Sequence, residues 1–287
     1  MRKLMMLAFS ALFLLSLNAA NPKKHYTVIV SLDGFRWDYP AMYRTPNLDR
    51  MAADGVKAVM LPSYPASTFP NHYTLATGLV PDHHGIINNT FWDAKNKRQY
   101  SMGDSATRNN PEYYLGEPIW ITAQKQGVKT GNMYWVGADI AIKNAHPTYY
   151  RPWNVKPFLS FEQRIDTVLT WLQKPEEERP GLVMLYFEEP DGSGHHNGPR
   201  SSQTGAVVQR MMGVLRKKIE ALPFAGDVNL IVTSDHGMTD ISAERVVNIN
   251  DYLKPEWCEV VDGRTPTSIF SKSEYRDSIY NTLKKAA

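Results

Sequence analysis

The sequence predicts a three-layer α/β/α sandwich with a mostly parallel central sheet. Apolar runs alternate along the chain with amphipathic segments, which is the order of strands and crossover helices in such folds. The apolar runs are nearly continuous, as expected for strands covered on both faces by helices. With 287 residues and 43% hydrophobic content, the chain is long enough to bury one large core.

Four runs of branched and aliphatic residues are the expected strands. They are residues 27–32, 128–134, 182–187 and 228–233. The first run ends at Asp33-Gly34, a turn signal, and the last ends at Ser234-Asp235.

The segments between these strands show helical periodicity. Thr45 is the expected N-cap of a helix with Pro46 at its first position and Gly55 as its stop. Three further helices are expected at residues 118–126, 162–172 and 207–222, where apolar residues recur at helical spacing.

The first twenty residues have the order of a secretory signal. Arg2 and Lys3 precede an apolar run and then small residues, and the run is shorter than a spanning helix requires, although a retained anchor is an alternative. We therefore expect a signal peptide at residues 1–20 and a catalytic domain at 21–287, with no stable membrane span after cleavage. Because Cys258 is the only cysteine, no intrachain disulfide can form, and a bacterial periplasm is the expected location.

The charge balance argues against a nucleic-acid partner. Without the first twenty residues, basic and acidic side chains are almost equal in number, and no clustered basic excess remains. A small-molecule substrate is the expected partner, and the oligomeric state is not predicted.

Aspartate and histidine side chains follow three of the expected strands. These candidate ligands are Asp33, Asp191, His195, Asp235 and His236. Loops at the carboxyl ends of parallel strands converge on one edge of a sheet, so the five can meet there. Carboxylate and imidazole donors without thiolates suit Zn²⁺, with manganese or iron as weaker candidates, and five ligands exceed one tetrahedral site. Two metal ions are therefore expected.

The glycine-rich segment 188–199 is expected to be a loop. Pro190, Gly192 and Gly194 oppose a regular helix, so we expect Asp191 and His195 not to meet as helical neighbours. His196 is expected to be a bystander.

A hydroxyl near Pro70 completes the expected site. Pro70 can open a helix, which places Ser67, Thr68 and Phe69 at an N-terminus where free N–H groups favour anions. A metal-activated hydroxyl there can act as a nucleophile, whereas the alternative is that Ser67 or Thr68 only caps the helix.

These motifs, taken in order, closely resemble the nucleotide pyrophosphatase/phosphodiesterase family of the alkaline phosphatase superfamily, in its bacterial type. The matching segments run from about residue 26 to residue 252: SLDGFRWDY, TPNLDRMAADGV, YPASTFPNHYTLATGLVPDHHGIINNTFWD, GEPIWITAQKQG, LYFEEPDGSGHHNGP and TSDHGM. The resemblance implies an alkaline-phosphatase-like fold and a two-zinc hydrolase of nucleotide phosphodiesters or phosphoanhydrides.

The resemblance also implies a role for each site residue. Thr68 corresponds to the nucleophile that becomes nucleotidylated, and with Asp33, Asp235 and His236 it corresponds to the ligands of one zinc. Asp191 and His195 correspond to two ligands of the other zinc. Asn89 and the backbone N–H of Phe69 would hold a phosphate oxygen. Phe69 and Tyr186 would stack on the base, and Tyr149, Tyr150 and Trp153 are candidates for the same pocket.

The sequence departs from the family in one respect. The family has a further zinc-binding histidine downstream of the DHGM motif, but His236 is the last histidine here. We therefore expect an incomplete C-terminus and fewer than two tightly held zinc ions. The alternative functions are a phosphomonoesterase, a lipid or choline phosphodiesterase, and an inactive metal-binding fragment.

Overall fold

The computed structural model describes residues 24–153, 155–262 and 266–286. The expected signal peptide, residues 1–20, lies outside this range. None of the described helices is long and apolar enough to cross a membrane.

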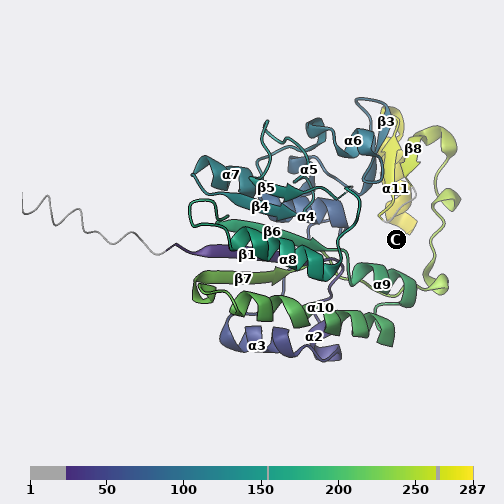
Figure 1. Cartoon of the computed structure of the whole chain (residues 1–287). Helices are drawn as coiled ribbons and strands as arrows, with labels where there is room; N and C mark the ends of the chain where they lie inside the picture. The colour runs from purple at the N-terminus through teal and green to yellow at the C-terminus, as the bar shows by residue number, and fades with distance from the viewer. Residues whose placement is uncertain (1–23, 154, 263–265, 287) are drawn as a thin grey trace, which may run out of the picture.

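A five-stranded parallel sheet forms the centre of the molecule, which confirms the expected fold class. Its strand order is β5-β4-β6-β1-β7, seen from top to bottom in Figure 1. The strands are β1 (Tyr26–Leu32), β4 (Thr130–Met133), β5 (Tyr149–Arg151), β6 (Leu182–Phe187) and β7 (Val228–Thr233). The short strand β5 was not predicted, because its tyrosines lie in a segment interpreted as a pocket wall.

Helices cover both faces of this sheet. On one face, α8 (Phe161–Leu172) packs on β4 and β6, and α10 (Ser202–Glu220) packs beside it. A Cβ atom added at Gly131 of β4 would lie 2.9 Å from the Trp171 ring of α8, so glycine permits this close approach. On the other face lie α4 (Thr68–Thr77) and α7 (Ile119–Lys125). Helix α7 is joined to β4 by a hydrogen bond that the Thr130 hydroxyl donates to Gln124 at 2.6 Å.

Shorter elements surround the sandwich. Two antiparallel hairpins, β2 (Thr90–Asp93) with β3 (Arg98–Ser101) and β8 (Cys258–Asp262) with β9 (Ser268–Ser271), lie outside the main sheet (Figure 1). The remaining α-helices are α2 (Tyr39–Met42), α3 (Pro46–Asp54), α5 (Pro81–His84), α6 (Ser105–Arg108), α9 (Asp191–Asn197) and α11 (Arg276–Ala286). The described residues also form six 3₁₀ turns: Pro111–Tyr113, Ala225–Asp227, Ala243–Arg245, Ile249–Asp251, Pro255–Trp257 and Ser273–Tyr275.

The expectation that every strand is covered on both faces is wrong for β7. Within the described part of the chain β7 pairs only with β1, and Ile231 is 47% exposed. A groove of about 1060 Å³ lies between β7 and the segment 55–62, and its lining includes Asp235 and His236. The apolar run therefore reflects an edge strand beside an apolar groove.

Candidate active site

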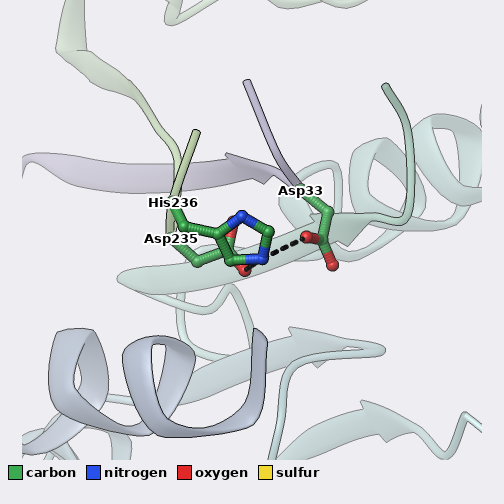
Figure 2. A group of neighbouring side chains, drawn as sticks. All are labelled: Asp33, Asp235 and His236. Atoms are coloured by element: carbon green, nitrogen blue, oxygen red, sulfur yellow. Dashed lines mark ion pairs between the residues drawn. The ribbon is translucent and has the colours of Figure 1, made fainter. Parts of the chain in front are cut away.

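Three of the predicted metal ligands converge at the carboxyl edge of the sheet. Asp33, Asp235 and His236 each offer a donor atom, and these atoms lie within 4.8 Å of one another (Figure 2). His236 Nε2 is 3.3 Å from Asp33 Oδ1 and 3.3 Å from Asp235 Oδ2.

Strand register explains why these residues meet. In the β1–β7 pair Ser31 lies opposite Thr233, so the two aspartates, each two residues further on, leave adjacent strands at the same level. A turn at Gly34, with φ of 66°, lets its N–H donate to Asp235 Oδ1 at 3.2 Å.

The two carboxylates are buried, which favours a bound cation. Asp33 and Asp235 are only 2% and 1% exposed, and burial raises the pKa of both carboxyls; for Asp33 the charge of Asp235 raises it further. Burial opposes protonation of His236, but the charges of Asp235 and Asp33 outweigh burial and raise the pKa of this imidazole. Asp235 Oδ2 is buried without a hydrogen bond. A divalent cation would supply the missing partner, so this donor set fits a metal ion.

Thr68 places its hydroxyl beside this cluster. Its Oγ1 atom lies 3.5 Å from Asp33 Oδ1 and 3.4 Å from His236 Nε2. Thr68 is the first residue of α4, and the preceding N-cap residue, Ser67, makes no side-chain capping hydrogen bond. Neither hydroxyl therefore acts as the cap that the alternative interpretation required.

Phe69 and Asn89 meet next to Thr68. The backbone N–H of Phe69 donates to Asn89 Oδ1 at 2.8 Å, across 20 residues of sequence. The two groups that the resemblance assigns to a phosphate oxygen thus lie together at the N-terminus of α4. Their binding role remains a prediction.

Asp191 and His195 form a pair of their own, and the expected loop geometry is wrong. Helix α9 spans Asp191–Asn197, and His195 Nε2 lies 3.4 Å from Asp191 Oδ1, one helical turn away. Pro190 precedes the helix, where a missing N–H costs nothing, and Glu189 Oε2 accepts the Ser193 N–H at 2.9 Å.

The glycines of α9 serve close contacts as well as flexibility. A Cβ atom at Gly194 would lie 2.4 Å from Met238 Sδ. Asp191 is held near the first cluster because its N–H donates to Asp33 O at 3.0 Å, and its buried Oδ1 atom has no hydrogen bond. His195 remains 70% exposed, and the exposed His196 bonds to Gly192 O at 2.8 Å.

His72 is a functional candidate that the sequence interpretation missed. This fully buried imidazole donates from Nδ1 to Thr68 O at 2.8 Å, and Nδ1 lies 3.3 Å from Asp235 Oδ2. Burial lowers its pKa, so the neutral ring accepts from the Ser31 hydroxyl at Nε2, 2.9 Å away. Its position four residues after Thr68, one turn along α4, is the signal that could have identified it.

The predicted pocket aromatics occupy different places. Tyr186 is 8% exposed, its hydroxyl donates to Asp33 Oδ2 at 2.6 Å, and its ring meets Trp153 edge-on at 5.5 Å. Tyr150 stacks on His146 at 4.8 Å. Tyr149 stacks on Trp171 of α8, on the other face of the sheet. Of the three candidates Tyr149, Tyr150 and Trp153, it is therefore Trp153 that contacts Tyr186. The hydrogen bond from the Tyr186 hydroxyl to Asp33 was not predicted.

Comparisons with known proteins identify the family of this chain. Residues 27–287 match the family described as type I phosphodiesterase / nucleotide pyrophosphatase. Human ectonucleotide pyrophosphatase/phosphodiesterase family member 1 is 42% identical over 233 residues, which is 79% of this chain and 25% of that protein. Human family member 5 is 34% identical over 281 residues, or 96% of this chain and 58% of that protein. The chain therefore spans about a quarter to somewhat more than half of these relatives.

Solved structures show the same fold. The mouse family member 5 structure has a TM-score of 0.80 and 36% identity, and the match covers 91% of this chain and 70% of that one. An inactive threonine-to-alanine variant of the mouse protein, in complex with AMP, has a TM-score of 0.81 and 35% identity over 92% of this chain and 71% of that one.

The parallel sheet, with its carboxylate and imidazole cluster at the carboxyl edge, defines an alkaline-phosphatase-like α/β protein. Within that class, the chain belongs to the type I phosphodiesterase / nucleotide pyrophosphatase family.

Proposed function

We propose that the protein is a metal-dependent hydrolase of nucleotide phosphodiester or phosphoanhydride bonds that acts through a nucleotidyl group on Thr68. The observation that carries this proposal is the position of the Thr68 hydroxyl, between Asp33 and His236 and at the N-terminus of α4. Residues 21–287 would form the catalytic unit.

Zinc is the proposed metal, with two ions per complete site. Asp33, Asp235, His236 and Thr68 would hold one ion, and Asp191 with His195 would provide two ligands for the other. Bound zinc lowers the pKa of a coordinated hydroxyl and neutralises charge on phosphate oxygens. The buried oxygens of Asp235 and Asp191 that lack hydrogen bonds support both positions.

The proposed reaction has two displacements at phosphorus. In the first, Thr68 Oγ1 loses its proton and bonds to phosphorus, while the bond to the departing alcohol or phosphate oxygen breaks and that oxygen gains a proton. In the second, a water molecule loses a proton and bonds to phosphorus while the bond from phosphorus to Thr68 Oγ1 breaks, and the proton lost by the water restores the Thr68 hydroxyl. The Phe69 N–H and the Asn89 amide would hold a non-bridging oxygen, and His72 fixes the backbone carbonyl of Thr68.

A nucleotide is the proposed substrate. AMP is bound in the inactive mouse relative, whose fold this chain shares. Phe69, Tyr186 and Trp153 would provide the aromatic surface for the base, and Tyr150, which stacks on His146, is a further candidate. No observation in the structure favours a monoester, lipid or choline substrate over a nucleotide.

Export from the cell is part of the proposal. The signal-like residues 1–20 support it, and related proteins carry the names "ectonucleotide" and "venom" phosphodiesterase. The periplasm follows if the source is a bacterium.

The proposal predicts that Thr68→Ala abolishes hydrolysis of the p-nitrophenyl ester of thymidine monophosphate by the zinc-loaded protein. The reason is that alanine has no oxygen to attack phosphorus. Ser67→Ala is the matched control, since Ser67 precedes Thr68 and its side chain makes no capping bond. This control should retain activity.

Two results would contradict the proposal. Undiminished turnover by Thr68→Ala would exclude Thr68 as the nucleophile, and faster cleavage of p-nitrophenyl phosphate than of the thymidine ester would indicate a monoesterase.

The proposed dependence on metal has its own test. Dialysis against a chelator should remove activity, and added zinc should restore it.

A further inference from the structure

Arg164 is a buried arginine that the proposed reaction does not use. It lies on α8 and is only 3% exposed. A buried charge is costly unless its hydrogen bonds are satisfied, so its partners indicate what the residue does.

The guanidinium group of Arg164 spans the end of β6. Its Nε donates to Leu159 O at 3.0 Å, and Nη1 donates to Tyr186 O at 3.4 Å. Nη2 donates to Glu188 Oε1 at 2.9 Å, while Nη1 also donates to Glu188 Oε2, giving a two-pronged ion pair. Only a planar guanidinium can make this set of bonds, because an ammonium group has no such fork.

Aromatic rings enclose the same guanidinium group. Its carbon lies 4.8 Å from the centre of the Tyr134 ring, 5.6 Å from those of Phe161 and Phe187, and 5.9 Å from that of Trp153. Such contacts stabilise a desolvated cation and restrict the positions that it can take. Arg164 is therefore a fixed point against which Glu188 is held.

Glu188 begins the segment that carries two proposed zinc ligands. It follows the last residue of β6 directly, and Asp191 is three residues further on. The Glu188 carbonyl accepts from Gly192 N–H at 3.4 Å, inside the first turn of α9. Fixing Tyr186 O and the Glu188 carboxylate therefore fixes where β6 ends and α9 begins.

We propose that Arg164 is a positioning residue, which holds the α9 segment in register with the Asp33 cluster through Glu188. The catalytic consequence rests on the proposed function, whereas the structural consequence does not.

The test compares Arg164→Lys, Arg164→Met and Glu188→Gln. Glu188 is 40% exposed, so its glutamine variant should fold even if burial makes Arg164→Met unstable. Arg210→Met is the matched control, because Arg210 pairs with Glu162 at 3.5 Å and lies 5.9 Å from the same Phe161 ring, but is 67% exposed. Thermal unfolding identifies any variant that does not fold.

Two readouts separate positioning from stability. Amide hydrogen exchange within residues 188–197 should accelerate in both Arg164 variants and, to a smaller extent, in Glu188→Gln, but not in Arg210→Met. With zinc saturating, kcat for the thymidine ester should fall between about tenfold and a hundredfold in both Arg164 variants, as for other residues that orient metal ligands. Lysine should not rescue either readout.

The outcomes distinguish this proposal from the proposed function. Unchanged exchange in Arg164→Lys and Arg164→Met, or accelerated exchange with undiminished kcat, would overturn the positioning role. Accelerated exchange together with no hydrolysis by the unaltered, zinc-loaded protein would support the positioning role and contradict the proposed function.

Discussion

At the scale of single residues, the hydroxyl of Ser234 joins the two loops that carry the metal cluster. It accepts the Phe35 N–H at 3.0 Å and donates to His236 O at 2.7 Å. Arg36 adds a second connection, because its Nη1 atom donates to Met238 O. Its Nε and Nη2 atoms donate to the Asp38 carboxylate, which holds the guanidinium group in place. Asp33 and His236 are thus oriented by bonds from neighbouring residues.

We predict that Ser234→Ala weakens zinc binding and lowers kcat, whereas Ser234→Thr retains both. Alanine leaves the Phe35 N–H and the His236 carbonyl without this partner, at a cost of about 1 to 3 kcal/mol. Thr233→Ala is the control, since the Thr233 hydroxyl donates to the neighbouring Ser234 O at 3.4 Å and not to the other loop. Zinc titration by calorimetry is the measurement. Equal zinc affinity in Ser234→Ala and the unaltered protein would contradict the prediction.

The first metal cluster could be predicted from the sequence, and its supporting residues could not. Asp33 and Asp235 come just after apolar runs, and parallel strands bring such positions to one edge of the sheet. Ser234 and Arg164 act through side-chain contacts with residues far away in the chain, which no local pattern encodes. His72 has one local signal, its position one helical turn after Thr68, but its contact with Asp235 is also distant in sequence.

At the scale of elements, tertiary contacts overrode local propensity in α9. Two glycines and a proline argued against a helix, but the cost of a glycine in a helix is only about 1 kcal/mol. The bonds from Ser193 N to Glu189 and from Asp191 N to Asp33 offset that cost. Helices α3, α7, α8 and α10 were predicted because their apolar residues recur at helical spacing, and four of the five strands of the central sheet were predicted because they are continuous apolar runs. Helix α11 was not predicted.

A buried histidine joins α4 to α5. His84 is fully buried. Its Nε2 atom donates to Pro70 O at 3.1 Å and lies 3.0 Å from Thr74 Oγ1. Its Nδ1 atom accepts from the Ile86 N–H at 3.2 Å. Burial lowers its pKa from 6.5 to about 4. Protonation of Nδ1 would remove the bond to Ile86.

We predict that His84 makes the protein less stable in mild acid. Below pH 6.5 the unfolded chain binds a proton that folded His84 does not bind until about pH 4. The stability that His84 contributes is therefore present above pH 6.5 and is lost as the pH falls toward 4. Urea unfolding of the unaltered protein and of His84→Gln should show the difference in free energy shrinking across this range.

His83→Gln provides the control, because His83 is the exposed neighbour on the same short helix. A pH-independent difference for His84→Gln would contradict the assigned neutral state.

At the scale of the whole molecule, the buried carboxylates make stability depend on metal. Burial opposes the charged form of both Asp33 and Asp235 and raises the pKa of each carboxyl, and the charge of Asp235 raises the pKa of Asp33 further. A ligand that binds only the folded state stabilises it in proportion to the logarithm of its concentration.

The architecture of the sheet could be predicted from the sequence, whereas the groove beside β7 could not. A continuous apolar run looks the same in the sequence whether the strand lies at the edge or in the centre of a sheet.

We predict that zinc raises the melting temperature of the protein and that Asp235→Asn removes this effect. Without metal, Asp235→Asn should melt higher than the unaltered protein, because asparagine keeps an acceptor for Gly34 N–H and removes a buried charge. Asp240→Asn is the control, since Asp240 is 58% exposed and pairs with Arg200 at 3.8 Å. Scanning calorimetry with and without zinc is the measurement. A zinc response that survives in Asp235→Asn would place the metal elsewhere.

The single helical turn between Asp191 and His195 limits how this segment can change in length. Each residue of an α-helix advances the chain by a rotation of about 100°. One inserted or deleted residue between the two would swing the imidazole to the flank of the helix, even if every side chain remained the same. Point substitutions between the two that the packing of α9 tolerates therefore preserve the pairing in a way that insertions and deletions do not.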